Sequence, residues 1–303
     1  MAISRGQLVK ELEPGLNALF GLEYKRYENQ HAEIYATETS DRAFEEEVML
    51  SGFANAQVKG EGSGVSFDEA QETFTARYTH ETVALAFAIT EEAIEDNLYD
   101  RLASRYTKAL ARSMSNAKQV KSVEPLINGL PSTDAFDSGD GVSLFNTAHP
   151  TVAGSFANTL ATQADLNETS LEQSLIDIGQ MSDERGLRIA ARGVKMIIPS
   201  ELQFTAERLM KSQGRTGTAD NDINAIVSMG MVPQGYRVNN YLTDADAFYI
   251  LTDVPNGMKM FNRAPLTTAM EGDFDTGNVR YKARERYSFG VSDPRGIYGV
   301  AGA

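Results

Sequence analysis

The sequence predicts an α+β fold in which a β-hairpin and one long helix accompany a mixed α/β unit. A strand-like run from Phe53 to Thr82 is broken only by a glycine-rich tip. A helical pattern extends from Thr90 to Lys121, and strand and helix patterns alternate between residues 142 and 250. Extended, helical and mixed segments in separate stretches favour the α+β class.

The hairpin is expected from Phe53 to Val58 and from Phe67 to Thr82, with polar residues on both faces. A strand pair without a clean apolar face cannot bury itself against its own domain. The tip holds three glycines from Gly60 to Gly64, and glycine accepts backbone angles that other residues resist, so we expect a pivot there. A projecting arm usually finds its partner on another subunit. The hairpin therefore points to assembly rather than catalysis.

The long helix is expected to begin at Thr90, a good N-cap, and to end before Pro125. Acidic residues fill its first turns and basic residues its last, which complements the helix macrodipole. About thirty residues at ~1.5 Å rise give roughly 45 Å, longer than a small domain is wide. We expect this helix to act as a spine. Its apolar residues recur at every fourth position, so the stripe winds around the helix: Ile94, Leu98, Leu102, Tyr106, Leu110 and Met114.

Composition narrows the class of protein. Among 303 residues, 28 Lys and Arg face 42 Asp and Glu, and the net charge of −14 argues against a dedicated nucleic-acid binder. Cysteine is absent, which excludes disulfides and thiolate metal sites. The chain lacks a run of about eighteen apolar residues and, at Met1–Arg5, a signal-peptide pattern. We therefore expect a soluble protein that the usual signal does not export.

Residues 1–50 are expected to form an extended arm with short helices. A small apolar face there is interrupted by Pro14-Gly15. A turn-rich connector, Asn128–Gly141, should follow the long helix. The residues of the apolar face are Leu8, Leu12, Leu16 and Phe20.

Residues 142–250 are expected to form the mixed α/β unit. A helix should run from Asp165 or Asn167 to Met181, with an apolar face of Leu171, Leu175 and Ile178. A sharp turn at Asp183–Gly186 should lead to a buried strand, and Gly214–Asp220 should be a surface loop. The remaining elements are a strand at Val194–Ile198, a helix at Glu201–Ser212 behind Pro199-Ser200, and strands at Tyr236–Asn239 and Phe248–Thr252.

The segment Val279–Val291 alternates with period two, which predicts a strand after a turn at Phe274–Asn278. One face is apolar except for Glu285, and the other carries four cations. Two interpretations stay open: an exposed edge strand protected by charge, or a strip that docks acidic surface of a neighbouring subunit, such as the 1–50 arm. The four cations are Arg280, Lys282, Arg284 and Arg286.

A search for catalytic or metal-binding patterns finds none. The three histidines, His31, His80 and His149, lie in separate segments without a His-Glu-x-x-His pattern. The stretch Gly60–Val65 lacks both the last glycine of a dinucleotide loop and a Gly-Lys-Ser/Thr sequence. Asp273–Gly277 resembles the start of a calcium loop, but acidic ligands are missing, and a turn is expected. We therefore expect no enzyme activity, no catalytic residue and no cofactor or metal site.

Several short segments, in their order and spacing, resemble the major capsid proteins of tailed bacteriophages, which have the Hong Kong ninety-seven-type fold. The likeness extends from about residue 20 to the C-terminus and is strongest toward the Mu-type major head subunits. No single segment is diagnostic. The matching segments are Phe87–Glu92, Asp96–Tyr99, Leu110–Ser113, Leu144–Pro150 and Pro199–Leu202.

This resemblance implies a particular organisation of the chain. An N-terminal arm would occupy residues 1–50 and an extended E-loop hairpin residues 51–85. The P-domain would hold the spine helix in 86–140 and return strands in 255–303, and the A-domain would occupy 141–254.

The resemblance also implies a structural function. The subunit would self-assemble through hexamers and pentamers into an icosahedral shell around a double-stranded DNA genome, which it would contact non-specifically. It would be assembled in the host cytoplasm, end in the virion and contact no membrane. Because no charged helical segment precedes the arm, either a separate scaffolding protein is implied or the chain is a processed form that starts at a Met. A portal is also implied and, as in some relatives, a cement or decoration protein.

Two other functions compete with this one. An encapsulin-like compartment protein has the same fold and would enclose a cargo enzyme instead of a genome. A cytoplasmic α/β enzyme with scattered catalytic carboxylates is the second alternative. Electron microscopy of the expressed protein, alone and with a scaffold, would separate all three.

Overall fold

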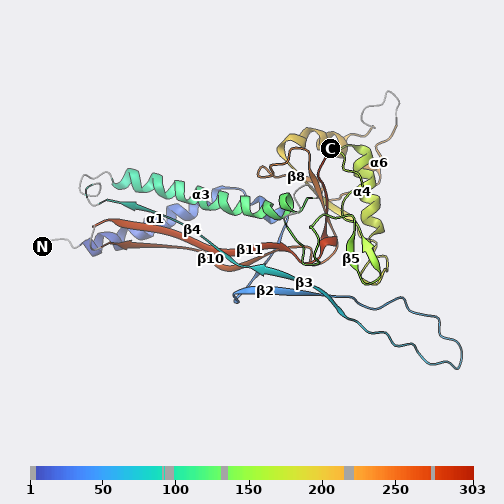
Figure 1. Ribbon diagram of the computed structural model, residues 1–303. Helices are drawn as coiled ribbons and strands as arrows, with labels where there is room; N and C mark the ends of the chain where they lie inside the picture. The colour runs from blue at the N-terminus through green and yellow to red at the C-terminus, as the bar shows by residue number, and fades with distance from the viewer. Residues whose placement is uncertain (1–4, 91, 93–98, 131–135, 215–221, 274–276) are drawn as a thin grey trace.

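The computed structural model describes residues 5–90, 92, 99–130, 136–214, 222–273 and 277–303. Figure 1 shows an elongated molecule. The helix α3 and several long strands run in one direction from a compact unit, and a hairpin loop projects in the other.

A four-stranded sheet, here called the long sheet, has the order β1-β10-β11-β4. β1 is parallel to β10, and the other neighbours are antiparallel. β11 lies between β10 and β4, so the interpretation of its segment as an exposed edge strand is wrong; β4 covers the edge that was expected to be free. The predicted alternation of β11 is confirmed. The strands are β1 (Ala36–Thr39), β4 (Glu81–Ile89), β10 (Met258–Gly272) and β11 (Val279–Val291).

The helix α3 (Tyr99–Asn128) packs on one face of the long sheet. It continues through Pro125, where the sequence predicted its end, because a proline in the last turn removes a single hydrogen bond and its carbonyl still accepts from Gly129 N–H at 3.1 Å. Tyr106, placed on the predicted stripe, is 48% exposed. The buried side follows the 3.6-residue period instead. It contains Ala103, Thr107, Leu110, Ala111 and Met114. Residues 91 and 93–98 and the side chain of Leu102 lie outside the described part.

The N-terminal segment forms one 22-residue helix, α1 (Arg5–Arg26), followed by η1 (Gln30–Glu33). The expected short helices are therefore wrong, because the helix continues through Pro14. Leu16 and Phe20 are buried against α3 and the long sheet, as their spacing predicts, and this packing stabilises the helix across the proline. The side chains of Leu8 and Leu12 lie outside the described part.

The hairpin consists of β2 (Phe44–Leu50) and β3 (Glu72–Thr79). Strands were expected at Phe53–Val58 and from Phe67 onward, and this is wrong for residues 53–58 and 67–71, while the turn expected at the glycine-rich tip is present at residues 61–62. The ladder ends at the Leu50–Glu72 pair, after a register shift at Val48, so the chain beyond it has no strand partner. Residues 51–71 form the hairpin loop, which projects from the molecule in Figure 1.

The compact unit contains a second four-stranded sheet, of order β12-β9-β7-β8, called the compact sheet. Helices α4, α5 and α6 cover one face, and the other face meets the long sheet and the end of α3. The bounds are β5 (His149–Thr151), β6 (Gly154–Phe156), α4 (Glu168–Gln180), β7 (Gly193–Ile198), η2 (Ser200–Leu202), α5 (Gln203–Lys211), α6 (Ala225–Ser228), β8 (Tyr236–Val238), β9 (Phe248–Thr252), η3 (Pro294–Gly296) and β12 (Ile297–Val300).

The elements expected in this unit are confirmed. Asn167 is the N-cap of α4 and accepts from Ser170 N–H at 2.9 Å. The apolar residues named for α4 are all buried. The sharp turn closes at Gly186 with φ +80, in the region that favours glycine. Most of the surface loop expected at Gly214–Asp220 lies outside the described residues.

Two strands pair with strands that the expected domain limits assign to a different domain. β12, within the range 255–303, pairs with β9 of the compact sheet. β4, most of it within the range 51–85, pairs with β11 of the long sheet. In the part of the chain that the structure describes, no helix is long and apolar enough to span a membrane.

Candidate assembly surfaces

The three histidines are buried in three separate hydrogen-bonded positions. His31 Nδ1 contacts Gln119 Nε2 at 3.0 Å. His80, between β3 and β4, contacts Ser288 Oγ at 2.9 Å and Ser40 Oγ at 3.0 Å. Each ring is therefore held in place, as expected of structural histidines. Among the described residues no three His, Asp or Glu side chains gather as a metal ion would require.

His149 starts β5 and contacts Asp140 Oδ2 at 2.6 Å and Asn158 Oδ1 at 3.0 Å. Burial alone would raise the pKa of Asp140, but hydrogen bonds from His149 and Ser138 outweigh it and hold that pKa below its usual range. Asn158 Nδ2 in turn donates to the carbonyl of Leu144 at 2.7 Å. These groups satisfy one another inside the compact unit, which suits a structural role.

The loop at Gly60–Val65, which superficially resembled a phosphate site, is a turn, and the loop that resembled a calcium site is described only at its two ends. In Gly60–Val65, Ser63 N–H donates to the Gly60 carbonyl at 3.2 Å, and no helix follows that would offer its N-terminus to a phosphate. At the other loop, Asp273 N–H donates to the Asn278 carbonyl at 2.8 Å, and the Asp273 carboxylate pairs with Arg280. Residues 274–276 lie outside the described part.

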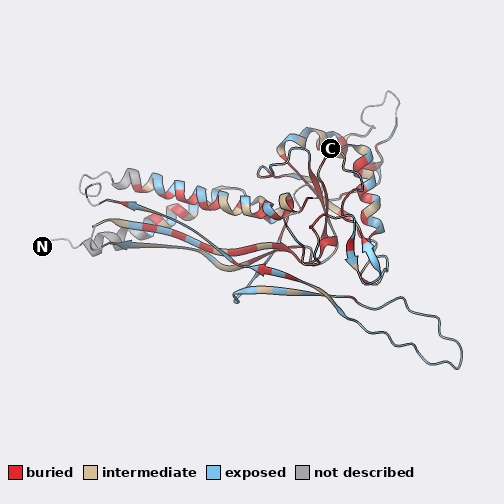
Figure 2. Ribbon diagram, viewed as in Figure 1, coloured by how far each residue is buried: buried red, intermediate tan, exposed pale blue. Residues whose placement is uncertain are grey.

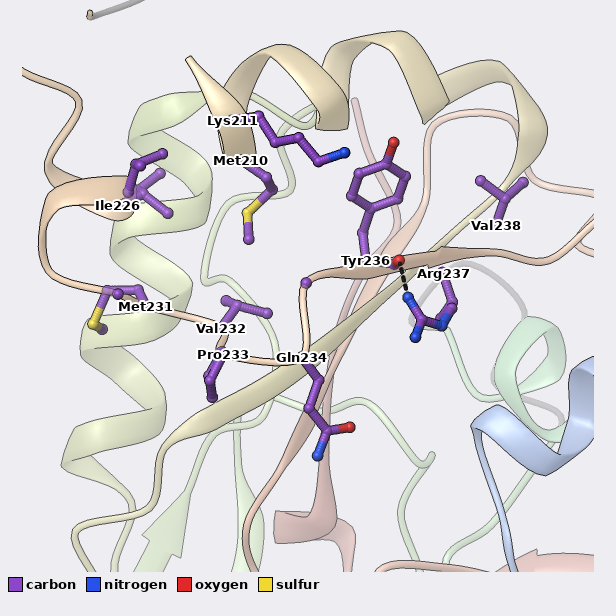
Figure 3. Close-up of a pocket in the computed structure, with 13 residues that line it drawn as sticks. Met210, Lys211, Ile226, Met231, Val232, Pro233, Gln234, Tyr236, Arg237 and Val238 are labelled. Carbon is purple, nitrogen blue, oxygen red and sulfur yellow. Dashed lines mark hydrogen bonds between the residues drawn. The ribbon is translucent and has the colours of Figure 1, made fainter. Parts of the chain in front are cut away.

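A groove of about 640 Å³ lies between α5, α6 and β8 (Figure 3). Its walls include Met210, Met231 and Val232, and two of its polar side chains share one carboxylate partner. Lys211 Nζ pairs with Glu207 at 2.9 Å, and the Tyr236 hydroxyl donates to the same carboxylate at 2.6 Å. The groove therefore presents apolar surface and no set of groups suited to acid–base or nucleophilic chemistry.

The hairpin loop exposes four large apolar side chains. Figure 2 shows the loop as an exposed trace. Large exposed apolar surface marks sites of interaction, so we expect a partner to cover these side chains. The side chains are Phe53 at 61% exposure, Val58 at 100%, Val65 at 69% and Phe67 at 97%.

The two ends of this loop are hydrogen-bonded to each other, and Arg185 binds the loop to the compact unit. Ser51 N–H donates to the Gln71 carbonyl at 2.9 Å, and Gln71 N–H donates to Ser51 Oγ at 3.0 Å. The Arg185 guanidinium donates to the Glu69 carbonyl and lies 3.8 Å from Asp68. The direction in which the loop leaves the molecule is therefore fixed by side chains that the sequence did not single out.

The hairpin strands are anchored on the long sheet. Tyr78 is buried, its ring lies on Gly290, and its hydroxyl contacts Ser292 Oγ at 2.5 Å. A methyl group on Gly290 would lie 2.6 Å from that ring, so the close approach requires glycine. Lys259 of β10 pairs with Glu47 of β2 at 2.6 Å. This half of the hairpin has a buried face, unlike the loop.

The cationic residues of β11 have two different environments. Arg280, Lys282 and Arg284 are exposed on the face of the long sheet opposite α3. Arg286 is half-buried, and its guanidinium lies 3.5 Å from the carbonyls of His80 and Ala43. The sheet register places small residues on both sides of Lys282 and Arg284, which are here called the cationic ridge. Arg280 lies opposite Glu271 of β10 and pairs with Asp273. The residues that flank the ridge are Ala84 and Ala86 on β4 and Thr267 and Ala269 on β10.

The lone acid of the apolar face, Glu285, is buried and is held by two partners. Lys118 Nζ of α3 lies 3.2 Å from its carboxylate, and the Tyr24 hydroxyl of α1 donates at 3.4 Å. Burial raises the pKa of Glu285 despite the attraction of Lys118. This triad fastens α1 and α3 to β11. In the sequence, the only indication of this triad was the position of Glu285 in an otherwise apolar stripe.

The family of the chain follows from comparison with known proteins. A family model described as "Phage capsid protein" matches residues 72–300, well over half of the chain. The chain belongs to this phage capsid family. The resemblance inferred from the sequence is thereby confirmed at family level, while the particular likeness to Mu-type subunits stays a prediction. Among curated proteins none matches.

Solved structures share the fold at low sequence identity. The capsid of Myoviridae phage XM1 has a TM-score of 0.53 at 12% identity and covers 89% of each chain. The Mycobacterium phage Ogopogo structure has a TM-score of 0.53 at 13% identity over 91% of this chain and 92% of that one. A virus-like particle from Pyrococcus furiosus has a TM-score of 0.52 at 12% identity over 94% and 97%. These likenesses identify the capsid fold, and the chain is a structural capsid protein of the virion.

Proposed function

We propose that this chain is the major capsid subunit of a tailed phage and forms an icosahedral shell of hexamers and pentamers around double-stranded DNA. The observation that supports the proposal is the hairpin loop, whose four large apolar side chains are mostly exposed within its own chain. A shell subunit needs large repeated interfaces rather than a pocket, and standard specific interfaces bury about 1,600 Å². We also propose that the subunit has no enzyme activity and is assembled in the host cytoplasm.

In this proposal the hairpin loop of one subunit covers the cationic ridge of a neighbour. The loop carries Glu61, Asp68 and Glu69 against Lys59, so its net charge is negative. The ridge is positive and is flanked by small side chains, which leave room for the apolar residues of the loop. The two surfaces of the same chain therefore have opposite charge, which suits repeated head-to-tail contacts.

The other partners are proposed on the resemblance. They are a separate scaffolding protein, a portal and a cement or decoration protein, with non-specific contact to genomic DNA. The domain limits are proposed in the same way: an arm at 1–50, an E-loop at 51–85, a P-domain at 86–140 and 255–303, and an A-domain at 141–254. An encapsulin-like compartment is the second candidate, favoured by the fold shared with the Pyrococcus furiosus particle.

Electron microscopy of the expressed protein, alone and with a scaffold, tests the proposal. A shell that closes in both conditions and takes up protein cargo would favour the compartment. A shell whose size and closure depend on the scaffold would favour the capsid. If only monomers appear under all conditions, the shell function is wrong.

The double reversal of Lys282→Glu and Arg284→Glu tests the ridge. We expect an unchanged circular dichroism spectrum and poor shell formation, with the parent shells weakened by salt because exposed charges are screened beyond ~10 Å at 0.1 M. Each exposed pair contributes only about 0.2–1 kcal/mol, but every subunit repeats it. The matched control is Lys108→Glu on the exposed side of α3. If the double variant assembles normally, the ridge does not dock a neighbouring subunit.

The glycine tip is proposed as the pivot of the hairpin loop during maturation. Gly62 has φ +79, where a β-branched residue is strained, and a side chain on Gly64 would meet open space. Replacing both by valine should leave the subunit folded and impair assembly or maturation. Particles of normal yield and shape from this variant would contradict the pivot.

A further inference from the structure

The sequence contains two Asn-Gly pairs, Asn128-Gly129 and Asn256-Gly257. In such a pair the backbone nitrogen of the glycine can attack the side-chain amide carbon of the asparagine, because no Cβ on the glycine obstructs the approach. A new carbon–nitrogen bond forms, and the amide nitrogen leaves as ammonia. Water then opens the cyclic imide to aspartate or isoaspartate. One water is consumed and one ammonia released, so no oxidant or reductant is needed.

The structure gives these two pairs opposite surroundings. Asn128 ends α3, and the Gly129 N–H that would have to react donates to the Pro125 carbonyl at 3.1 Å. Gly129 is also buried, and a methyl group on it would lie 2.6 Å from Leu144. Cyclisation there requires the last turn of the helix to unfold. The first pair is therefore protected.

Asn256 lies in the turn between β9 and β10, where it is exposed to solvent. Its φ is +60, a backbone region that asparagine occupies more readily than most residues. Its side chain is exposed, and cyclisation there requires a short turn and its contact with Gly296 to rearrange rather than a helix to unfold. We propose that Asn256 is a site of spontaneous deamidation, which converts it slowly to aspartate and isoaspartate in the folded protein.

The position of this turn gives the modification a structural consequence. The turn links β9 of the compact sheet to β10 of the long sheet, and η3 links β11 back to β12. The two links touch: a methyl group on Gly257 would lie 2.8 Å from Gly296 Cα, and Ser292 N–H donates to the Gly257 carbonyl at 3.0 Å. Isoaspartate adds a carbon to the backbone at residue 256. It would therefore disturb the contact between the two links that join the sheets.

Peptide mass spectrometry of the intact protein, incubated for weeks in mildly alkaline buffer at physiological temperature, tests the proposal. We expect a gain of about one dalton at Asn256, with isoaspartate detected by a methyltransferase assay, at a rate at least tenfold that at Asn128. The matched control, Asn256→Gln, should lose this signal while keeping the circular dichroism spectrum. Equal rates at the two asparagines, or no modification at Asn256, would overturn the proposal.

A second measurement tests the consequence for the junction. The aged parent should exchange the Ser292 amide hydrogen several-fold faster than fresh protein, because its acceptor lies beside the lengthened backbone. The variant Asn256→Asp adds the charge without lengthening the backbone, and its Ser292 amide should exchange as in fresh parent. Exchange that is unchanged after ageing, or equally fast in Asn256→Asp, would refute the role of the isoaspartate backbone.

Discussion

The compact unit and the hairpin loop use the same kinds of side chain in opposite ways. Phe248 in β9 is 0% exposed, whereas Phe67 in the loop is 97% exposed. The compact unit buries a large apolar core within one chain, whereas the large apolar side chains of the loop are mostly exposed. The first region is therefore expected to determine whether a subunit folds, and the second whether subunits assemble.

The largest effect is expected in the compact unit, from Phe248→Ala. Removing a fully buried phenylalanine leaves a cavity, and such changes cost about 3–5 kcal/mol of unfolding free energy. Denaturant unfolding of the isolated subunit should show the loss as a lower midpoint. A loss below about 1 kcal/mol would mean that the unit can collapse around the cavity.

A loss of similar or slightly smaller size is expected from Lys118→Met, which leaves the buried carboxylate of Glu285 without its cation. Breaking a buried ion pair on one side costs about 3–5 kcal/mol. The pKa of Glu285 is already raised by burial, so the folded state takes up its proton more readily than the unfolded state. Stability of the variant should therefore fall as pH rises from the ordinary carboxyl pKa through the raised one.

The control for this prediction is the double variant Lys118→Met with Glu285→Gln. It removes the buried charge together with its partner and should recover most of the loss at neutral pH. A double variant as unstable as Lys118→Met alone would show that lost packing of the lysine stem, rather than the unpaired carboxylate, causes the effect.

A smaller, pH-dependent effect is expected at His31, whose pKa is lowered to about 4, first by burial and then by the nearby charge of Lys118. Between pH 6.5 and 4 the unfolded state binds a proton that the folded state does not, so acid destabilises the fold in this window. The loss is at most about 3.4 kcal/mol. The variant His31→Asn keeps an acceptor for Gln119, and its stability should fall less over the same pH range. Parallel pH profiles of parent and variant would contradict this prediction.

The comparison also explains which parts of the fold the sequence could predict. In the compact unit, the cap at Asn167, the turn at Gly186 and the apolar spacing of α4 are local signals, and each element formed close to its expected place. The same holds for the alternation of β11. Such signals depend on residues a few positions apart, so one chain segment contains all of the information.

The errors concern partners that are distant in sequence. The ladder of the hairpin is set by pairing of Phe44–Leu50 with Glu72–Thr79, and strand propensity alone predicted further strands at residues 53–58 and 67–71. Pro14 and Pro125 stay inside helices because packing elsewhere outweighs one lost hydrogen bond each. β11 is interior because β4 reaches it from another part of the chain. The partners of Glu285 and Arg185 also lie far from them in the sequence, so the sequence did not predict these contacts.

The smallest effect on folding is expected from Phe67→Ala in the hairpin loop. Because this ring is 97% exposed, its removal should change the unfolding free energy of the subunit by less than about 0.5 kcal/mol. If the loop covers a neighbouring subunit, the same change removes buried area from every contact of the shell, and assembly yield should fall sharply. The matched control is Phe204→Ala on α5, a ring that is 70% exposed but lies on the compact unit. Shell yield measured by sedimentation should fall for Phe67→Ala and hold for Phe204→Ala. Equal yields from the two variants would mean that the loop's exposed rings have no special part in assembly, and the contrast between the two regions would then fail.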